Sequence, residues 1–435
     1  MDAVQPGFRG SSGARSYPRR DLLRAAGGAG LLMAISPASG RLRMAALAQE
    51  ATPLATPMAS PVGGQAARFA YVGCYTRNAP GGGGTAPAVG ISVFAVDANS
   101  GVLTLVETIP SDNPSFLALD PTQQFLYAVN EVDDFEGRPT GSVEAYAIDD
   151  TTGQLTLLNR QDCGGAIPAH LAVDPTGTHL VIGNYIGANY VVLPIAANGQ
   201  LDPISDTVEQ TGSGPNAERQ EAPHPHVVVF DAGGRHVVTA DLGIDKVQAF
   251  RLDTDAGTLE LTSEVSTAAG AGPRHVAFHP NGSYLYVINE LNATITAYAY
   301  DSAVGEIGDE IQTVSTVPDD FTGTKSTAEI VVHPAGDFLY GSNRGQPDAT
   351  SPVADSIATF TIDSATGRLS LVGHTTDGMD TPRNFALDPT ATWLYACNQQ
   401  ADTIVQFAVD PGSGELAATG EVTTSPTPVC IVFRT

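Results

Sequence analysis

The sequence predicts an all-β fold: a seven-bladed β-propeller with four-stranded blades, closed by pairing of the N- and C-terminal strands. Three observations support this prediction. One strand–turn–strand unit occurs six times, a second turn occurs seven times, and the two chain ends together supply the missing seventh unit. Repeats of about fifty residues, each too small to bury its own apolar face, are typical of propellers.

The first repeated unit reads FLALDPTQQFLYAVN at residues 116–130. Apolar residues alternate on both sides of an Asp-Pro turn, which predicts two antiparallel strands joined tightly. Five more copies follow, at residues 170–184, 227–241, 275–289, 329–343 and 384–398.

The second turn comes after each of these units and contains a glycine every time. The seven glycines are Gly101, Gly153, Gly199, Gly257, Gly305, Gly367 and Gly414. The strand–turn–strand unit is therefore one copy short of seven. The two strands of the missing copy are FAYVGCY (69–75) at one end of the propeller and TPVCIVF (427–433) at the other. Pairing these two segments would close the ring and remove the exposed sheet edge.

The first fifty residues differ from the repeats. Arg19 and Arg20 precede a weakly apolar stretch that is too short to span a bilayer, and Ala46-x-Ala48 offers a cleavage site. Residues 1–48 thus resemble a twin-arginine export signal, followed by an Ala/Thr/Pro-rich linker (49–67) and the propeller (68–435). We expect export by the twin-arginine route to the periplasm, the cell surface or the extracellular space.

The composition limits the partners. The formal net charge is −26, and without residues 1–50 the chain has 14 basic against 44 acidic residues. Such a surface repels nucleic acid and anionic membranes, so we expect neither as a partner once the signal is removed, and we expect a monomer. The four cysteines show no zinc-binding spacing. A Cys74–Cys430 disulfide remains open, although buried free thiols are favoured.

The start of each first strand and the end of each second strand should open on the same face of the ring, around the central channel. An Asn or Asp ends the second strand in every copy, which suggests that it bonds loop backbone. The positions next to these strand ends differ between copies and include charged residues and histidines. Those expected to converge at the opening of the central channel are His226, Arg274, Glu290, Arg344, His170, Glu329 and Arg383. Such a cluster favours a ligand site over the alternative, a solvated rim of internal ion pairs.

Several motifs together resemble one known family. They are YVGCYT at 71–76, RQEAPHPH at 219–226, GPRHVAFHP at 272–280, YVINE at 286–290 and YGSNRG at 340–345. The chain resembles, over about residues 68–435, the lactonase-type seven-bladed propellers, which include bacterial 6-phosphogluconolactonases and fungal carboxy-cis,cis-muconate lactonizing enzymes. The resemblance implies that His226, Arg274, Glu290 and, with a looser match, Arg344 form the active site, without a metal or cofactor.

Lactone opening needs a base to activate water and donors for the developing oxyanion. We expect His226 to be that base, titrating near neutrality, with Glu290 orienting it or a water. Arg274 and Arg344 would bind the oxyanion and an anionic group of the substrate. The expected substrate-binding residues are His170, Glu329, Arg383 and Arg219, the last from a loop above the site. His224 is expected to be a structural hydrogen-bonder.

The sequence leaves the exact reaction open. A sugar-acid-type lactone is the favoured substrate, but 6-phosphogluconolactone is cytoplasmic, and the export signal argues for another lactone. A cycloisomerase of the carboxymuconate type would use the same groups in the ring-closing direction. A non-catalytic exported propeller that binds a ligand or protein is the third alternative.

Overall fold

The computed structural model describes residues 64–77, 88–345 and 355–435, which all belong to one compact unit, Thr56–Thr435. The predicted export signal and most of the predicted linker lie outside these residues. The described part of the chain contains strands and turns only, so it has no helix of the length and hydrophobicity needed to cross a bilayer.

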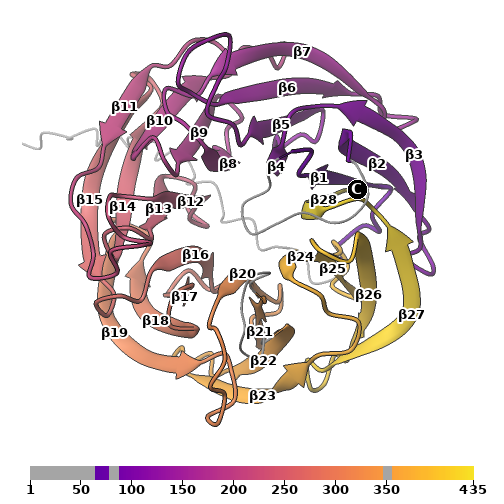
Figure 1. Cartoon of the computed structure of the whole chain (residues 1–435), viewed down its shortest axis with the longest axis vertical. Helices are drawn as coiled ribbons and strands as arrows, with labels where there is room; N and C mark the ends of the chain where they lie inside the picture. Colours follow the sequence, from indigo (N-terminus) through magenta and orange to yellow (C-terminus); the bar gives the residue numbers. More distant parts are fainter. Residues whose placement is uncertain (1–63, 78–87, 346–354) are drawn as a thin grey trace, which may run out of the picture. The chain divides into compact units, whose positions relative to one another are not determined.

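The strands form seven antiparallel sheets of four, arranged as a ring (Figure 1). We number these sheets blades 1 to 7 and give their strands from the channel outward. Blade 1 contains β28 (Pro428–Arg434), β1 (Phe69–Cys74), β2 (Gly90–Val96) and β3 (Leu103–Pro110). Blade 2 contains β4 (Pro114–Leu119), β5 (Phe125–Asn130), β6 (Ser142–Ile148) and β7 (Leu155–Asp162). Blade 3 contains β8 (Pro168–Val173), β9 (His179–Asn184), β10 (Asn189–Pro194) and β11 (Asp206–Glu209).

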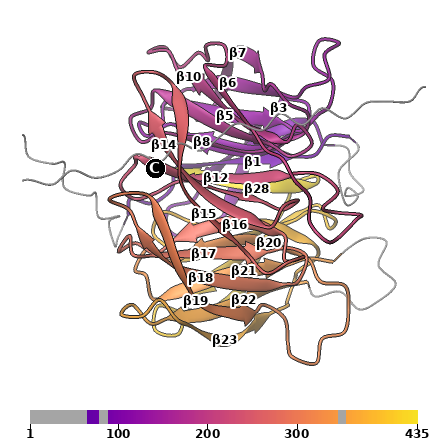
Figure 2. The ribbon, with the colours of Figure 1, turned by 90° about the vertical axis from the view of Figure 1, so that its left-hand side faces the viewer.

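The remaining blades repeat this order, and Figure 2 shows several of them from the side. Blade 4 contains β12 (Pro225–Phe230), β13 (His236–Asp241), β14 (Lys246–Asp253) and β15 (Thr258–Ser266). Blade 5 contains β16 (Pro273–Phe278), β17 (Tyr284–Asn289), β18 (Thr294–Asp301) and β19 (Glu306–Ser315). Blade 6 contains β20 (Thr327–Val332), β21 (Phe338–Asn343), β22 (Ser356–Ile362) and β23 (Leu369–Thr375). Blade 7 contains β24 (Pro382–Leu387), β25 (Trp393–Asn398), β26 (Thr403–Val409) and β27 (Leu416–Thr424).

The two ends of the propeller pair as the sequence predicts. Strands β1 and β28 are antiparallel, from Phe69 opposite Arg434 to Gly73 opposite Cys430. The four cysteines are buried free thiols, which confirms the favoured alternative for them. The seven-bladed, four-stranded and circularly closed fold is therefore confirmed.

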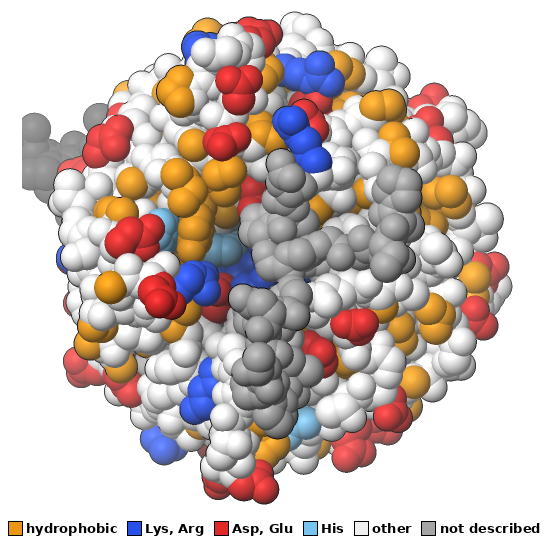
Figure 3. All heavy atoms as spheres, viewed as in Figure 1, with side chains coloured by type: hydrophobic (Ala, Val, Ile, Leu, Met, Phe, Trp, Pro, Cys, Tyr) orange, Lys and Arg blue, Asp and Glu red, His pale blue; other side chains and the backbone are white. Residues whose placement is uncertain are grey.

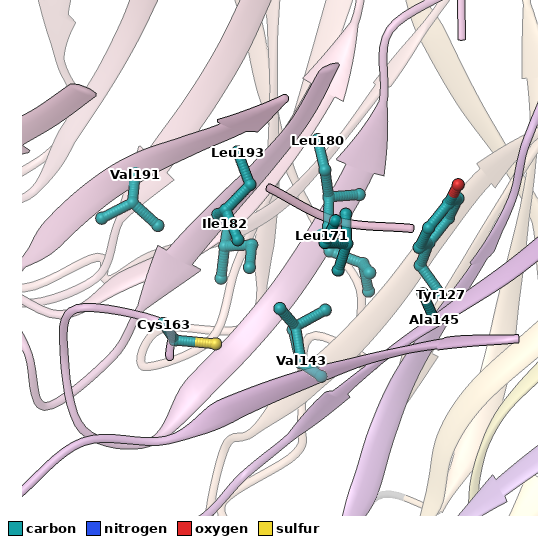
Figure 4. Close-up of a cluster of buried hydrophobic side chains, with 11 residues drawn as sticks. Tyr127, Val143, Ala145, Cys163, Leu171, Leu180, Ile182, Val191 and Leu193 are labelled. Atoms are coloured by element: carbon teal, nitrogen blue, oxygen red, sulfur yellow. The ribbon is translucent and has the colours of Figure 1, made fainter. Parts of the chain in front are cut away.

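Apolar side chains fill the space between neighbouring blades. The cluster in Figure 4 joins blades 2 and 3: Tyr127 and Val143 lie on blade 2, and Leu171, Ile182 and Val191 on blade 3. All five are at most 1% exposed. Because each such cluster needs residues from two blades, no blade can bury its faces alone.

A hydrogen bond from a tyrosine crosses to the next blade at five of the seven blade boundaries. The tyrosine hydroxyl donates to the carbonyl of the predicted turn glycine, as in Tyr127 to Gly199 at 3.1 Å and Tyr395 to Gly101 at 2.6 Å. The other three pairs are Tyr71–Gly153, Tyr286–Gly367 and Tyr340–Gly414. The Tyr395–Gly101 bond joins blade 7 to blade 1, so it also fastens the closure.

Six of the seven inner strands begin at a proline, and the seventh, β20, begins at Thr327; the prolines are Pro114, Pro168, Pro225, Pro273, Pro382 and Pro428. Proline fits a first strand position because no ladder hydrogen bond from its nitrogen is needed there. The register with the second strand then slips, for example between Pro225 and Val227. The residues set out of register in this way are Ser115, Ala169, His226, Arg274, Arg383 and, in blade 1, Val429; blade 6 bypasses both Ala328 and Glu329. Such β-bulges re-aim side chains and recur next to active sites.

The Asn or Asp that ends each second strand bonds the surrounding loops in most blades, as predicted. Asn184 Nδ2 donates to the carbonyl of Cys163 at 2.7 Å, and Asp241 Oδ1 accepts from the backbone N–H of His224 at 2.7 Å. Asn289 differs, because its amide donates to two threonine hydroxyls instead.

The turn glycines give a test of the packing between blades. Gly153 has φ of 72°, and a Cβ there would lie 2.4 Å from the ring of Phe69 in blade 1. Gly137 has φ of 76°, but nothing lies within 4 Å of its Cβ position, so it is a matched control for backbone strain alone. We expect Gly137→Ala to cost about 1 kcal/mol and Gly153→Ala about 1–3 kcal/mol more. Urea unfolding followed by tryptophan fluorescence measures both, and equal losses would contradict this account of the blade contact.

Candidate functional site

The seven inner strands enclose a small hollow on one face of the ring, where basic and histidine side chains are visible at the centre (Figure 3). Its lining residues are Ser115, Phe116, Glu131, Ala169, His226, Arg274, His275, Glu329, Arg383, Asn384 and Val429. Seven of the out-of-register residues are among them, one from each blade. The β-bulges therefore deliver side chains from all seven blades to one point. The cavity volume is about 10 Å³, close to the minimum for one water molecule.

All eight residues predicted for the site gather at this hollow or next to it. His226, Arg274, Glu329 and Arg383 line it. His170 touches the lining through its ring, while Arg219, Glu290 and Arg344 are tied to Arg274 by ion pairs around a single carboxylate.

That carboxylate belongs to Glu290, whose side chain is 2% exposed. Arg344 Nη2 donates to Oε2 at 2.8 Å, and Arg219 Nη2 donates to Oε1 at 2.7 Å. Arg274 Nε lies 3.1 Å from Oε2, as an ion pair whose N–H does not point at the oxygen. Three cations from three blades or loops thus surround one buried anion.

This arrangement fixes the protonation of Glu290. Burial alone would raise the pKa of its carboxyl group, but the charges of Arg344, Arg219 and Arg274 outweigh burial and hold the pKa far below its usual range. Glu290 is therefore ionised, as predicted. Both carboxylate oxygens are engaged by arginines, and of the two expected partners of Glu290, His226 bonds neither oxygen. Glu290 instead holds the arginines in place.

Three histidines from neighbouring blades meet at the hollow. The ring centroid of His275 lies 5.1 Å from that of His226 and 5.3 Å from that of His170. Burial, assisted by Arg274 and His275, holds the pKa of His226 well below 6.5. The prediction that His226 titrates near neutrality was therefore wrong, because a buried imidazole beside a guanidinium resists a second positive charge. The pKa of His170 is likewise well below 6.5, chiefly through burial.

His275 is the histidine with a carboxylate partner. Its Nδ1 lies 2.9 Å from Glu329 Oε1, and the other oxygen of Glu329 accepts from Asn384 Nδ2 at 2.5 Å. The backbone N–H of Glu329 donates to Ser342 Oγ, and Asn384 Oδ1 accepts from the backbone of Ile431. Burial would raise the pKa of Glu329, but His275 and Arg274 lower it overall, so it is ionised and accepts from Nδ1.

Arg383 takes part in a separate network on the opposite side of the hollow. Its Nη2 donates to Tyr75 Oη at 2.7 Å, and that hydroxyl donates to Glu131 Oε2 at 2.7 Å. The Arg383 guanidinium also lies 5.2 Å from the centroid of the Tyr75 ring. Among the four arginines of the site, Arg383 is the one that forms no ion pair with a carboxylate in the described part of the chain.

The loop before β12 supplies Arg219 and His224. Arg219 reaches both Glu290 and, at 3.4 Å, Tyr185 Oη, which places this loop residue beside the hollow. His224 stacks on the Tyr185 ring with centroids 4.4 Å apart, and its Nδ1 lies 3.0 Å from the Tyr185 carbonyl oxygen. The structural role predicted for His224 is confirmed.

Sequence reasoning missed four residues: His275, Asn384 and Glu131, which line the hollow, and Tyr75, which bonds Arg383 and Glu131 beside it. His275 and Asn384 occupy the same repeat position as His170 and Glu329, so the signal was available at that position. Tyr75 and Glu131 follow strand ends and meet across two blades, which no spacing reveals. The described residues contain no group of three or more His, Cys, Asp or Glu side chains with the geometry of a metal site.

Comparison with known proteins places this geometry in a family. Residues 69–433 match the family described as Lactonase, 7-bladed beta-propeller. The chain is 36% identical over 365 residues to a 6-phosphogluconolactonase of Bacillus subtilis, covering 83% of this chain and 97% of the relative. It is 34% identical over 333 residues to a 6-phosphogluconolactonase of Formosa agariphila, covering 76% and 89%.

Solved structures agree with this assignment. The periplasmic gluconolactonase of Pseudomonas aeruginosa superposes with a TM-score of 0.74 at 27% identity, covering 84% of this chain and 99% of that one. The match of the family to nearly the whole propeller, together with relatives above 30% identity over most of their length, decides the assignment. This chain belongs to the lactonase family of seven-bladed β-propellers.

Proposed function

We propose that the protein hydrolyses a lactone, in the manner of a 6-phosphogluconolactonase. The observation that carries this proposal is the convergence of uncharged histidines and arginine guanidinium groups on one hollow. The names of the relatives support the same reaction class. Both kinds of group are needed, because hydrolysis requires a proton acceptor and a stabiliser of negative charge.

The reaction follows from these groups. A histidine that is neutral at pH 7 takes a proton from water, and the water oxygen attacks the lactone carbonyl carbon. The negative charge that develops on the carbonyl oxygen is stabilised by guanidinium N–H groups. The ring C–O bond then breaks, the proton passes to the leaving oxygen, and a hydroxy acid is released. Water is the only second reactant.

The arginines divide this work differently from the sequence hypothesis. Arg274 and Arg383 line the hollow and are placed to meet the oxyanion or an anionic substituent. Arg344 does not line it and is held by Glu290, so we assign it to positioning Arg274 through their shared carboxylate. The four guanidinium groups outnumber Glu131, Glu290 and Glu329 by one, which favours an anionic transition state.

We also propose that the reaction takes place outside the cytoplasm. The twin-arginine motif, the short apolar stretch and the Ala-x-Ala site at residues 19–48 support this location, as does the periplasmic gluconolactonase among the relatives. A periplasmic or extracellular site favours an unphosphorylated sugar-acid lactone.

The substrate class is tested by pH-stat titration of the purified protein with a panel of glucono-δ-lactone, 6-phosphogluconolactone and a muconolactone, with and without EDTA. We expect proton release above the spontaneous rate for a sugar-acid lactone, unchanged by EDTA because the proposed chemistry uses side chains alone. No acceleration with any lactone of the panel would contradict the proposed function. Activity that EDTA removes would contradict the proposed catalyst.

Arg274 gives the sharpest single-residue test of oxyanion stabilisation. Arg274→Ala should lower kcat/KM about 100-fold or more, because one donor of this kind contributes that much. Arg219 and Arg344 still compensate Glu290 in the variant, so the fold should persist. Arg251→Ala is the control: Arg251 is half exposed on β14 and pairs only with Glu260. A wild-type kcat/KM for Arg274→Ala, with thermal unfolding unchanged in both variants, would overturn the role of Arg274.

Export is tested with Arg19→Lys and Arg20→Lys together in the full-length chain. Lysine keeps the positive charge, so only a route that reads the arginine pair responds to the change. We expect the wild type in the exported fraction and the double variant inside the cell, as measured by immunoblots of fractions. Arg41→Lys with Arg43→Lys is the matched control. Export of the double variant at the wild-type level would contradict the route.

A further inference from the structure

Among the three histidines of the hollow, only His275 is built as a general base. Glu329 fixes it through Nδ1, and a carboxylate can only accept, so the Nδ1 nitrogen carries the proton. The Nε2 nitrogen is then the one with a free lone pair. It is buried and has no hydrogen-bond partner, while the ring lines the hollow.

Glu329 is itself held from three sides. His275 and Asn384 engage its two oxygens, and its backbone N–H is bonded to Ser342. Asn384 is fixed in turn by Ile431 on β28. The imidazole is therefore oriented by a carboxylate whose own position is fixed by neighbouring blades, the arrangement that serves general bases in hydrolases.

His226 lacks these features. Its Nδ1 is buried without a hydrogen-bond partner, and its ring contacts are with the aromatic rings of Tyr185 and His275. The neighbours that shift the pKa of His226 all lower it, whereas Glu329 opposes the lowering at His275. His275 is therefore the more basic of the two while remaining neutral at pH 7.

We propose that His275, and not His226, is the general base of the lactone hydrolysis, with Glu329 and Asn384 as the positioning residues that hold its Nε2 toward the reacting water. In the reaction, Nε2 takes one proton from the water as the oxygen bonds to the carbonyl carbon. The same proton moves to the ring oxygen when the C–O bond breaks, which returns His275 to its starting state. This inference rests on the proposed function and assigns a residue within it.

The cavity volume supports the assignment. About 10 Å³ is close to the space that one ordered water needs, and the water also needs polar partners. Ser115 and His275 line the hollow, and Ser115 Oγ and His275 Nε2 are buried without a hydrogen-bond partner, so these residues offer a donor and an acceptor. A water bonded to Nε2 would occupy the position from which it attacks.

The pH dependence follows from the groups that face His275. They are Glu329 on β20, Arg274 on its own strand, Arg383 on β24, His226 on β12 and His170 on β8. Of these, only Glu329 raises the pKa of His275. Loss of the carboxylate should therefore lower that pKa and move the acidic limb of the kcat/KM profile to lower pH.

The variants His275→Gln and His226→Gln form a matched pair, since both residues lie on inner strands and touch each other. We expect His275→Gln to lose kcat about 100-fold or more, and to lose the acidic limb with it. His226→Gln should keep the limb. Glu329→Gln should shift the limb to lower pH, and Glu329→Asp should restore it in part. A merely structural role of Glu329 would lower activity at every pH without moving the limb.

A second measurement does not depend on turnover. Nitrogen-15 NMR of histidine-labelled protein, assigned with His275→Gln, reports tautomer and pKa directly. We expect the Nδ1–H tautomer for His275 and a pKa above those of His170 and His226. The Nε2–H tautomer, or an unchanged limb in His275→Gln, would overturn the inference alone. A wild-type protein with the expected tautomer that hydrolyses no lactone would overturn the proposed function and, with it, the assignment of a base.

Discussion

The pairing of β1 with β28 is the interaction on which the rest of the structure depends. It joins residues more than 350 positions apart in sequence, at Phe69 and Arg434. Without it, blade 1 would lack its inner strand and blades 1 and 7 would each leave one face uncovered. Because every blade buries apolar side chains against two neighbours, the loss would expose core in the two blades that complete the circle. The Tyr395–Gly101 hydrogen bond reinforces the same boundary.

Closure also creates the site. Each inner strand begins with a proline or threonine and a β-bulge, and in an open arc these bulges would face solvent separately. In the closed ring they point to one axis, so side chains from all seven blades share one hollow. Concentrating charges there is costly unless they are paired. Glu290 is paired with three arginines, and Glu329 accepts hydrogen bonds from His275 and Asn384, so a buried, polar centre is compatible with a stable fold.

Much of this could be predicted from the sequence. The repeated strand–turn–strand units, the seven turn glycines and the split terminal strands indicated blade number and closure, because these features can be read from local patterns along the chain. The residues around the hollow could also be predicted, since strand order places the same repeat positions on one face. The hydrogen bonds and ion pairs among these residues could not be predicted. Glu290 bonds Arg219, which lies 71 residues away in sequence, and His275 bonds Glu329, which lies 54 residues away. The local sequence pattern does not show that Glu290 bonds arginines and not His226, or that Glu329 bonds His275.

The prediction that His226 titrates near neutrality was wrong for a related reason. An imidazole at a strand start reads as solvent-exposed, and its ordinary value then suggests titration near neutrality. Its burial results from the neighbouring blades, and the guanidinium beside it comes from β16. Both effects arise only when the ring is assembled. Residue type could therefore indicate the chemistry available at the site, while the protonation of each group depends on the packing between blades.

The small positive excess at the hollow has a further consequence when it is set against the formal charge of −26 on the chain. A distant anion is repelled by the molecule as a whole, and it is attracted only within about a Debye length, ~8 Å at physiological ionic strength, of the guanidinium groups. Dissolved salt screens the long-range repulsion more strongly than the short-range attraction of a partly buried site. For an anionic ligand, association should therefore become faster as ionic strength rises, the reverse of the behaviour of proteins that steer their ligands by attraction.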